Sequence, residues 1–178
     1  MVIDTPRTRL RPWQEADREP FAALHAHPEV MRDLGGPIDR AASDKKLANY
    51  RTAFCRCGVS RWAIETRDGN FLGYAGVMPS PEDHPLGAHF QIGWRLVREA
   101  WGKGYASEAA AAALSDAFSR VGLQEIVAYT TRENRRSQAV MKRLHMKRDP
   151  SRDFTATYDN VGVWHGLVWV ARPVAPTR

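Results

Sequence analysis

One stretch of the sequence decides the fold: Phe90–Arg120, which reads FQIGWRLVREAWGKGYASEAAAAALSDAFSR. It begins as a strand, because apolar and polar or small residues alternate from Phe90 to Leu96 with the two-residue period of a pleated ribbon. A turn with two glycines follows, and an alanine-rich helix is expected over Tyr105–Phe118. A strand, a glycine turn and a helix therefore form the predicted centre of the molecule.

The turn Trp101-Gly102-Lys103-Gly104 has the features of an anion site. Glycine lets the backbone approach a ligand closely, and the first amides of a helix have no intrahelical acceptor. The helix dipole also favours negative charge at this end, so the turn is a place to hold phosphate. Two glycines are a weak signal on their own, and a turn without a ligand is the default interpretation.

Two other phosphate-binding motifs are excluded by position. A Walker loop needs Ser or Thr after its Gly-Lys pair, whereas Lys103 is followed by Gly104. A dinucleotide fingerprint needs a third small residue, which Ser107 nearly supplies, and an acidic residue about 20 positions on. Glu125 is near that distance, but it precedes the next predicted strand instead of ending it.

Motifs spread along the chain make a longer pattern. They are Thr8-Arg9-Leu10-Arg11-Pro12-Trp13, His27-Pro28-Glu29-Val30-Met31, the central W-G-K-G-Y-A-S-E-A, Asn134-Arg135-Arg136-Ser137 and Met141-Lys142-Arg143-Leu144. This pattern resembles the GNAT superfamily of acetyl-CoA-dependent N-acetyltransferases. The likeness is strongest to its Rim-type branch, the ribosomal-protein N-terminal acetyltransferases and their small-molecule-acting relatives, and it spans nearly the whole chain.

Composition describes an ordinary globular protein of 178 residues, with 43% hydrophobic and 26% charged residues. No apolar run approaches the ~20 residues that cross a bilayer, and the N-terminus lacks the features of a signal peptide. We therefore expect one domain over residues 1–178, with a tail at 173–178, in the cytoplasm and without membrane contact. Cys55 and Cys57 are too close for a good disulfide and complete no metal set, so they are expected to be reduced and no metal is expected.

The net charge of +6 raises the question of nucleic acid. The basic residues are scattered among 20 acidic ones without a long run, so no nucleic-acid partner is expected. A modest positive field suits a polyphosphate such as coenzyme A (CoA) equally well.

Periodicity and turn residues place the other elements. Further strands are expected at Thr8–Arg11, Ser60–Thr66, Phe71–Pro79, Glu125–Thr131, Asp153–Asn160 and Val163–Arg172. Further helices are expected after Trp13–Asp17, over Ala41–Cys55 and over Arg135–Leu144. Pro28 ends the first helix or starts a second short one, Asp68-Gly69 predicts a hairpin, and Gly122 predicts a left-handed cap.

Hairpin-linked strands with helices at both ends of the sheet predict an α/β fold. The resemblance implies the GNAT fold, a mixed and mostly antiparallel central sheet flanked by helices. In it, the strand that ends at Leu96–Arg98 and the strand Ile126–Thr131 run parallel and splay apart at their C-terminal ends. The intervening helix agrees with the right-handed crossover that such a pair needs. The loop Ser80–Ala88 is expected to border the substrate entrance.

The resemblance implies acetyl-CoA as cosubstrate. Its pyrophosphate would lie on the main-chain amides of Trp101, Gly102, Lys103, Gly104, Tyr105, Ala106 and Ser107. Its pantetheine arm would pair with the exposed strand edge at Leu96, Val97 and Arg98, and an amide at or just before Leu96 would stabilise the thioester oxygen as charge develops on it. Glu99 stands where the family often has Gln or Arg, so Arg98 is the candidate to compensate. Arg143 matches a basic residue that would reach the adenosine phosphate.

Asn134 and Ser137 are the candidate catalytic residues. Their spacing across a helix start by itself indicates capping. In the resembled family the Asn contacts pantetheine and the Ser lies near the sulfur, so Ser137 is the candidate to protonate the leaving thiolate, an anion of pKa ~8.5. His145 departs from the usual Gly after Leu144, so it either adopts a left-handed conformation or the helix ends differently.

No residue is an unambiguous base for the acceptor amine. Gln91 stands where relatives often carry Glu, and it does not titrate. Glu65, His89 and His165 remain, each with a structural role as the favoured interpretation, and His25 and His27 are interpreted as surface residues of a helix. The shortage favours a peptide α-amine, of pKa ~7.7–8.0, or a small amine of low pKa over a lysine of pKa ~10.4.

The sequence therefore predicts an N-acetyltransferase in which a primary amine attacks acetyl-CoA directly in a ternary complex. The alternative is a non-catalytic CoA-binding or regulatory module on the same fold, which Gln91 and Glu99 keep open. A homodimer through the last strand is compatible with the pattern.

Overall fold

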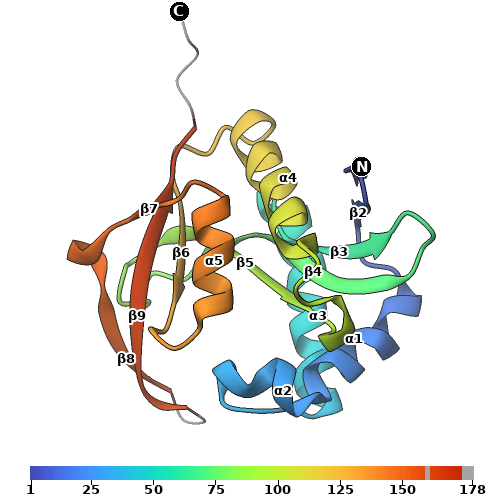
Figure 1. Ribbon diagram of the computed structural model, residues 1–178, viewed down its shortest axis with the longest axis horizontal. Coiled ribbons are helices and arrows are strands. Elements are labelled where there is room, and N and C mark those ends of the chain that lie inside the picture. Colours follow the sequence, from blue (N-terminus) through green and yellow to red (C-terminus); the bar gives the residue numbers. More distant parts are fainter. Residues whose placement is uncertain (159–160, 174–178) are drawn as a thin grey trace, which may run out of the picture.

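A mixed β-sheet runs through the whole molecule (Figure 1). The computed structural model describes residues 1–158 and 161–173, and within them the sheet has nine strands in the order β1-β2-β3-β4-β5-β6-β9-β7, with β8 paired to β9 off this path. The strands are β1 (Ile3–Asp4), β2 (Thr8–Arg11), β3 (Arg61–Thr66), β4 (Phe71–Ser80), β5 (His89–Leu96), β6 (Ile126–Thr130), β7 (Lys147–Arg148), β8 (Phe154–Tyr158) and β9 (Gly162–Ala171). Neighbouring strands are antiparallel except β5 and β6, which confirms the mixed, mostly antiparallel sheet.

The sheet opens between the parallel strands β5 and β6. Among the described residues, Gln91 and Val127 are the single paired position between them, although β5 continues to Leu96 and β6 to Thr130. The two strands therefore diverge toward their C-terminal ends, as the family resemblance implied. We call the resulting opening, between Gln91–Leu96 and Val127–Thr130, the splay.

Helices cover both faces of the sheet. They are α1 (Arg18–Ala26), α2 (Pro28–Met31), α3 (Arg40–Cys57), α4 (Tyr105–Ser119) and α5 (Arg135–Arg143), with short 3₁₀ helices η1 (Glu15–Asp17), η2 (Arg32–Leu34), η3 (Arg98–Ala100) and η4 (Pro150–Arg152). One apolar cluster joins α4 to the β3 side chains of Trp62 and Ile64. A second cluster joins α1 and α3 to Tyr74 of β4, on the opposite face. No helix in the described part of the chain is long and apolar enough to cross a membrane.

Small side chains let α4 lie close against the sheet. Its buried alanines, each at most 2% exposed, are Ala109, Ala110, Ala113 and Ala117. They share a core cluster with Ile64, Val77 and Ile126. Because packing in the interior is dense, a helix with methyl side chains approaches the strands more closely than one with larger residues. This packing holds the first turn of α4 beside the splay (Figure 1).

The expected elements that fall within the described residues agree with the observed ones to within about two residues, the ordinary uncertainty of element ends. Pro28 starts α2, with His27 as its N-cap. Gly122 adopts the expected left-handed conformation, and so does His145, at φ +55°. The strands β1 and β7 were not predicted, because two residues are too few to show a period. Residues 159–160 of the expected strand and 174–178 of the expected tail lie outside the described residues.

The strand β5 ends at Leu96, the first of the expected end residues Leu96–Arg98, because the Ala100 N–H donates to Val97 O at 3.0 Å in the turn η3. One expectation about local structure was wrong. His25 is fully buried instead of lying on the surface. Its Nδ1 lies 2.9 Å from Phe21 O and its ring stacks on Tyr74, so α1 turns this residue toward the sheet.

Candidate active site

The turn before α4 holds its two glycines in the left-handed region. Gly102 has φ +76° and Gly104 has φ +83°, values that other residues adopt at a cost. A Cβ at position 102 would meet no atom of the chain within 4 Å, so the conformation and not a protein neighbour requires glycine there. Both glycines are exposed, which leaves the backbone at this turn open to a ligand.

The amides of this turn are free. The first backbone bond into α4 runs from the Glu108 N–H to Gly104 O at 3.1 Å. In the described residues no hydrogen bond uses the main-chain N–H groups of residues 102–107. Six donors at a helix start with no acceptor of their own form an anion site when they point to one side. The buried hydroxyl of Ser107 also has no partner within this part of the chain.

Two residues of the N-terminal segment, Thr5 and Arg7, are hydrogen-bonded to the same turn, and we call them the strap. Arg7 donates from Nη1 to Lys103 O at 2.8 Å and from Nε to Glu108 Oε2 at 2.7 Å. Thr5 donates its hydroxyl to Glu108 Oε1 at 2.6 Å. Burial raises the pKa of Glu108, but the hydrogen bonds from Thr5 and Arg7 outweigh burial and hold it below its ordinary value. The carboxylate is therefore charged and already paired. Sequence reasoning missed this strap, because its members are about a hundred residues apart.

Trp101 fixes the other side of the turn. Its indole Nε1 donates to Leu96 O at 2.9 Å. Two guanidinium groups lie over its ring, that of Arg98 at 4.8 Å and that of Arg136 at 4.4 Å. Cations over an indole face are attracted by its quadrupole. Arg136 lies in the first turn of α5, on the far side of the splay, so Trp101 contacts both sides of the opening. Arg98 is also paired with Glu29 at 2.8 Å.

Alternation along β5 decides which amides face the splay. The Val97 N–H donates to Leu72 O at 2.9 Å, toward β4. In an antiparallel pair, hydrogen bonds to the same partner recur at every second residue. The amides of Trp94 and Leu96 therefore face the opening, whereas that of Val97 is occupied. Of the three predicted edge residues, Leu96 alone lies on a strand and presents a free edge.

Asn134 and Ser137 stand where α5 starts, across the splay from β5. The Asn134 side chain accepts from the Ser137 N–H at 3.1 Å, so the capping interpretation is confirmed. Its amide donates to Asp33 Oδ2 at 3.0 Å, and Asp33 in turn pairs with Arg95 of β5 at 3.0 Å. This chain of contacts joins the two arms of the splay through η2. The Ser137 hydroxyl makes no hydrogen bond within the described residues and is free for a ligand.

The model of the acetyltransferase (GNAT) domain family matches residues 7–147. This chain belongs to the GNAT family. It is 31% identical over 144 residues to the protein YkkB of Bacillus subtilis (strain 168), covering 80% of this chain and 83% of YkkB. It is thus an acetyl-CoA-dependent acetyltransferase.

Solved structures share the fold of this GNAT enzyme. An acetyltransferase from Agrobacterium tumefaciens str. C58 superposes with a TM-score of 0.82 at 27% identity, over 97% of this chain and 95% of that one. RimL, a ribosomal L7/L12 alpha-N-protein acetyltransferase in complex with coenzyme A, superposes with a TM-score of 0.76 at 14% identity, over 97% and 98% of the two chains. The resemblance to GNAT enzymes is therefore confirmed, with a Rim-type enzyme among the fold neighbours.

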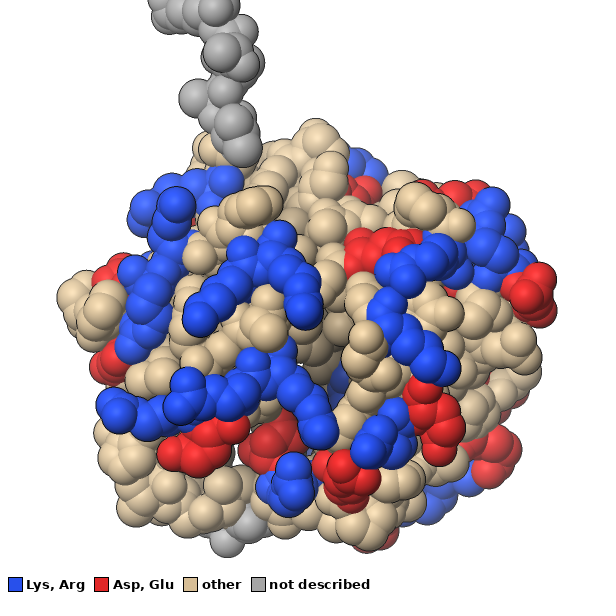
Figure 2. Space-filling view, in the orientation of Figure 1, with Lys and Arg blue, Asp and Glu red and all other residues tan. Residues whose placement is uncertain are grey.

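Basic side chains lie around the splay. Figure 2 shows lysine and arginine on both sides of a hollow on the face that carries α4 and α5. Lys103 and Arg143 are exposed. Arg143 lies in the last turn of α5, at the opposite end from Asn134, so the two residues are about 13 Å apart along the helix axis. In the described part of the chain no cluster of three His, Cys, Asp or Glu side chains could hold a metal.

A buried arginine of β3, Arg61, reaches across to β5. The guanidinium of Arg61 donates to Gly76 O, and at 3.0 Å each to Gln91 O and Gln91 Oε1. A Cβ at Gly93 would lie 2.8 Å from Arg61 Nη2, so a larger residue there would displace the guanidinium. Burial lowers the pKa of Arg61. No carboxylate of the described residues pairs with it, so Gln91 acts as a neutral partner for a buried cation.

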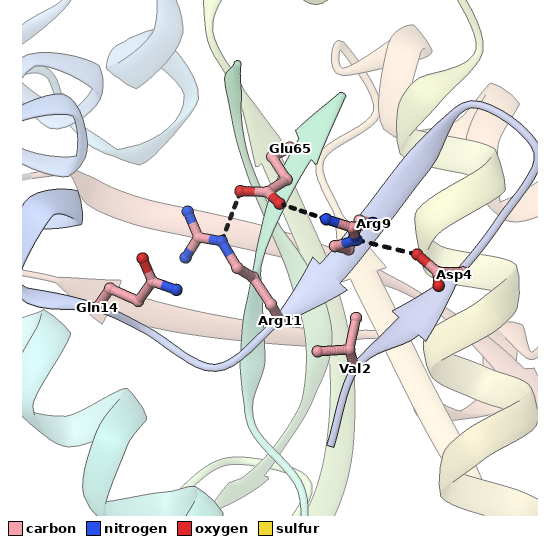
Figure 3. Close-up of a pocket in the computed structure, with 6 residues that line it drawn as sticks. All are labelled: Val2, Asp4, Arg9, Arg11, Gln14 and Glu65. Atoms are coloured by element: carbon pink, nitrogen blue, oxygen red, sulfur yellow. Dashed lines mark hydrogen bonds and ion pairs between the residues drawn. The ribbon is translucent and has the colours of Figure 1, made fainter. Parts of the chain in front are cut away.

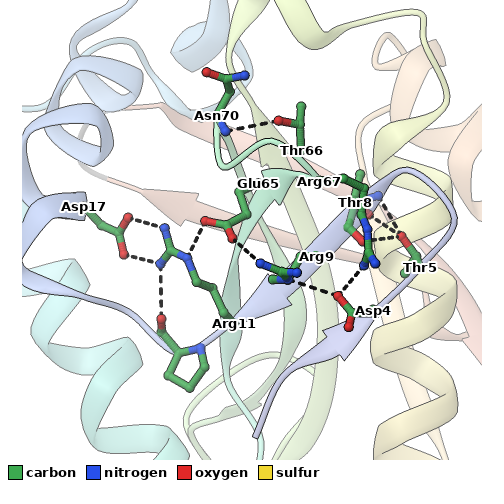
Figure 4. A network of polar contacts seen from close by, with 11 residues as sticks. Asp4, Thr5, Thr8, Arg9, Arg11, Asp17, Glu65, Thr66, Arg67 and Asn70 are labelled. Carbon is green, nitrogen blue, oxygen red and sulfur yellow. Dashed lines mark hydrogen bonds and ion pairs between the residues drawn. The ribbon is translucent and has the colours of Figure 1, made fainter.

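Glu65, a candidate base, is part of a structural ion-pair chain. Its carboxylate accepts from Arg11 Nε at 2.6 Å and lies 3.6 Å from Arg9 Nη1. Figure 4 shows how Arg9 continues to Asp4 and Arg11 to Asp17. An open pocket of about 540 Å³ lies over this chain (Figure 3). Its charges are already paired with one another, so we place no catalytic group there.

The two other candidate bases differ from each other. His165 is exposed, and its Nδ1 lies 3.0 Å from the Thr155 hydroxyl. His89 starts β5 and packs against His84 and Tyr129. Sequence reasoning did not single out His84, because its loop shows no period that would direct it toward the sheet.

Proposed function

We propose that this GNAT enzyme transfers the acetyl group of acetyl-CoA to a primary amine, either a peptide α-amine or a small-molecule amine, by direct attack in a ternary complex. One observation carries the proposal: the free amides of residues 102–107 lie beside a sheet that is open for a second chain-like ligand. The diphosphate of acetyl-CoA fits the amides, and its pantetheine arm fits the open edge.

The thioester carbonyl lies near the free amides of Trp94 and Leu96. When the amine attacks, the carbonyl oxygen becomes negative, and a fixed N–H donor stabilises it more than it stabilises the ground state. Ser137 faces the same opening from α5 and supplies a proton to the departing thiolate. Because a thiolate of pKa ~8.5 leaves readily, this proton contributes modestly.

Direct attack needs no enzyme nucleophile. The two cysteines, Cys55 and Cys57, lie at the end of α3, beside the C-terminal end of α4, where Arg120 donates to Gly58 O at 2.6 Å, and so at the opposite end of α4 from the glycine turn. Cys55 is exposed and Cys57 is partly buried against the core. Neither observation favours an acyl-enzyme.

Charges on the acceptor side indicate the kind of amine. Arg61 is 7% exposed, and the Arg95 side chain is 11% exposed. Asp33, the carboxylate that faces Arg95, is shared between Arg95 and Asn134. An acceptor with several positive charges would therefore meet buried arginines, whose effect at short range in a protein interior is large. We infer that the acceptor carries a neutral or anionic group next to its amine.

Two measurements test the proposed function. Calorimetry should detect binding of acetyl-CoA to the wild-type protein, and release of free thiol should report turnover with short peptides, aminoglycosides and polyamines as acceptors. Initial rates that converge when both substrates are varied indicate a ternary complex, whereas parallel lines would contradict direct attack. Binding of acetyl-CoA without thiol release from any of these acceptors would contradict the proposed acceptor classes. No binding of acetyl-CoA would refute the proposed function.

A homodimer through the last strand stays a prediction. Residues 167–171 of β9 pair with β6, and residues 162–166 pair with β8. Within the described residues β8 is the one strand that pairs with residues 162–166, so this half of β9 keeps one edge for a second copy.

A further inference from the structure

The strand β9 extends further than its neighbour β6. β6 ends at Thr130, which pairs with Leu167, whereas β9 begins at Gly162. Figure 1 shows β9 running on beyond the end of β6. Residues 162–166 pair with β8 on the side of β9 that also carries β7. In the part of the chain that the structure describes, no strand pairs with residues 162–166 on the other side, in line with β6, and we call this side the free edge.

Alternation along β9 shows which backbone groups lie on the free edge. The Val168 N–H donates to Asp153 Oδ1 at 3.0 Å, and the Val168 carbonyl accepts from the Asp149 N–H at 2.9 Å. Asp149 follows β7 and Asp153 precedes β8, so the backbone of Val168 faces those two strands. Because the direction of the backbone groups alternates along a strand, those of Val163 and His165 face the free edge. Within the described residues, their N–H and C=O groups have no hydrogen-bond partner.

The chain after β6 turns away and leaves this edge open. Gln138 Nε2 donates to Thr131 O at 3.0 Å and to Arg132 O at 2.8 Å. These bonds direct the segment after β6 toward α5, so it does not continue the pairing with β9. The side chain of Val163 is 63% exposed, and His165 is exposed too. A ligand can therefore reach the backbone of β9 where a further stretch of β6 would otherwise lie.

The free edge is level with the amides that are proposed to hold the thioester oxygen. Three residues beyond the paired position of β5 and β6, Trp94 is level with Thr130, which pairs with Leu167. Two residues further along β5, Leu96 is level with His165. These positions lie on the open side of the β5–β6 pairing, where the two strands diverge. A chain placed in line with β6 thus has one end beside the splay.

The free edge lacks the protection that the end strands of the sheet carry. β1 and β7 have two residues each, and they include Asp4 in β1 and the pair Lys147–Arg148 in β7. Short strands and charged residues are ways in which proteins prevent unwanted pairing at an edge. Residues 162–166 read Gly-Val-Trp-His-Gly, with no proline, lysine, arginine, aspartate or glutamate. The outer edge of β8 is uncharged as well, but it faces away from the splay.

Aromatic contacts hold the β8–β9 hairpin against the sheet. The Trp164 ring lies 5.5 Å from Phe154 of β8 and 6.1 Å from Tyr129 of β6. A Cβ at Gly166 would lie 2.6 Å from the rings of Phe154 and Trp164, so glycine leaves room for this packing. A two-stranded hairpin alone is marginally stable, and these rings tie it to a third strand. The free edge is therefore positioned before a ligand arrives, which lowers the ordering cost of binding.

We propose that a peptide acceptor binds as an added strand on the free edge of β9, antiparallel to β9 and in line with β6. This inference rests on the proposed function and selects the peptide α-amine from its two acceptor classes. The direction follows from the position of the thioester: the peptide N-terminus lies near Leu167, and the rest of the peptide runs toward Gly162. Main-chain hydrogen bonds to Val163 and His165 then hold alternate peptide residues, whatever their side chains.

A backbone scan of the acceptor tests the added strand with the wild-type enzyme. The probes are hexapeptides with a free α-amine that differ in their first residue, and the best of them is then methylated at one peptide nitrogen at a time. Methylation replaces the N–H that a strand would donate to β9. Values of kcat/KM should fall about tenfold at every second residue and change little at the residues between. An equal loss at every residue, or no loss at any, would overturn the proposal.

A matched pair of proline variants tests the same edge from the enzyme. Val163→Pro removes an N–H of the free edge, and Thr157→Pro removes one from the outer edge of β8, directly opposite Val163. Val163→Pro should raise KM for the best hexapeptide about tenfold, with kcat and acetyl-CoA affinity unchanged. Thr157→Pro should match the wild type, and the same KM in both variants would count against the free edge.

The remaining outcomes separate this inference from the proposed function. Thiol release with small amines but with none of the hexapeptides would refute the added strand and leave acetyl transfer standing. A wild-type protein that does not bind acetyl-CoA in calorimetry would refute the proposed function itself. Light scattering addresses a second copy at the same edge: a dimer that Val163→Pro converts to a monomer would assign the edge to that copy and overturn the inference.

Discussion

The turn proposed to bind acetyl-CoA and the face proposed to bind the acceptor are built in opposite ways. The turn at residues 101–107 is contiguous and most exposed at residues 102–104, and it presents main-chain amides. The proposed acceptor site, which we call the acceptor face, draws side chains from α1, β3, β4, β5 and β6, most of them buried. Backbone recognition suits a cosubstrate that is the same for every family member. Side chains from many elements suit an acceptor that differs from one enzyme to the next.

The largest expected effect is on stability at the acceptor face. Burial lowers the pKa of His25 from 6.5 to about 4. Below pH 6.5 the unfolded chain binds a proton at this residue that the folded chain refuses, so stability falls with pH until about pH 4. The loss at this one site is roughly 3 kcal/mol. The exposed cosubstrate turn has no buried titratable group that would respond in this way.

Urea unfolding at a series of pH values checks this prediction, with His25→Gln as the comparison. Carboxylates that titrate in the same window contribute to both proteins, so the difference between their pH profiles isolates His25. The wild type should lose about 3 kcal/mol more than the variant between pH 6.5 and 4. Parallel profiles would mean that His25 is not buried as a neutral ring.

The next largest effect tests whether acetyl-CoA binding depends on the backbone conformation of the turn. Gly102→Val places a β-branched residue at φ +76°, at a strain of about 1–3 kcal/mol. It should weaken acetyl-CoA binding by about 100-fold, because either the backbone shifts to relieve the strain or the valine side chain blocks the ligand. Gly122→Val is the matched control, because Gly122 has φ +77° and open space around its Cβ but lies beyond the end of α4.

Thermal unfolding and calorimetry together separate the two glycine variants. Both should lose stability to a similar degree, whereas acetyl-CoA affinity should fall in the Gly102 variant alone. Equal acetyl-CoA affinity in the two variants would contradict binding of the diphosphate at this turn.

The contrast between the two regions also explains what the sequence could predict. Gly102 and Gly104 were identifiable because the signals for glycine at these positions are local. The residues that indicate the preceding strand, the turn and the helix start all lie within a few positions of them. The helix α4 followed from its alanine-rich composition in the same way, and these features depend on the chain within a few residues of each position. The parallel pairing of β5 with β6, in contrast, was implied by the resemblance to the GNAT family.

The acceptor face could not be predicted, because its roles arise from residues distant in sequence. Arg61 pairs with Gln91, and His25 lies against Tyr74. Nothing near His25 in the sequence distinguishes a buried face of α1 from an exposed one, and its interpretation as a surface residue was wrong. His84 likewise stacks on Tyr129, which belongs to another strand, and the residues around His84 in the sequence do not indicate this contact.

Removing the strap at the turn should have a smaller effect than changing the glycine. Arg7→Ala breaks the bonds to Lys103 O and Glu108, and it leaves the Glu108 carboxylate without its cation beside the diphosphate site. KM for acetyl-CoA should rise about tenfold, from lost ordering and added repulsion, with kcat little changed. Arg67→Ala, which breaks an exposed ion pair with Asp4 instead, should leave KM unchanged. A double variant with Glu108→Gln should regain part of the loss, and no recovery would contradict the electrostatic part of this account.

The smallest expected effect is at Ser137, between the two regions. Ser137→Ala should lower kcat by roughly threefold to tenfold, because a thiolate is already a fair leaving group, and it should leave KM for acetyl-CoA unchanged. Ser119→Ala is the control, since that hydroxyl bonds to Ser115 O at the far end of α4. A rise in KM with unchanged kcat would make Ser137 a binding residue and extend the cosubstrate region across the splay to α5. A fall in kcat alone places it with the chemical step, so this variant decides to which of the two regions the start of α5 belongs.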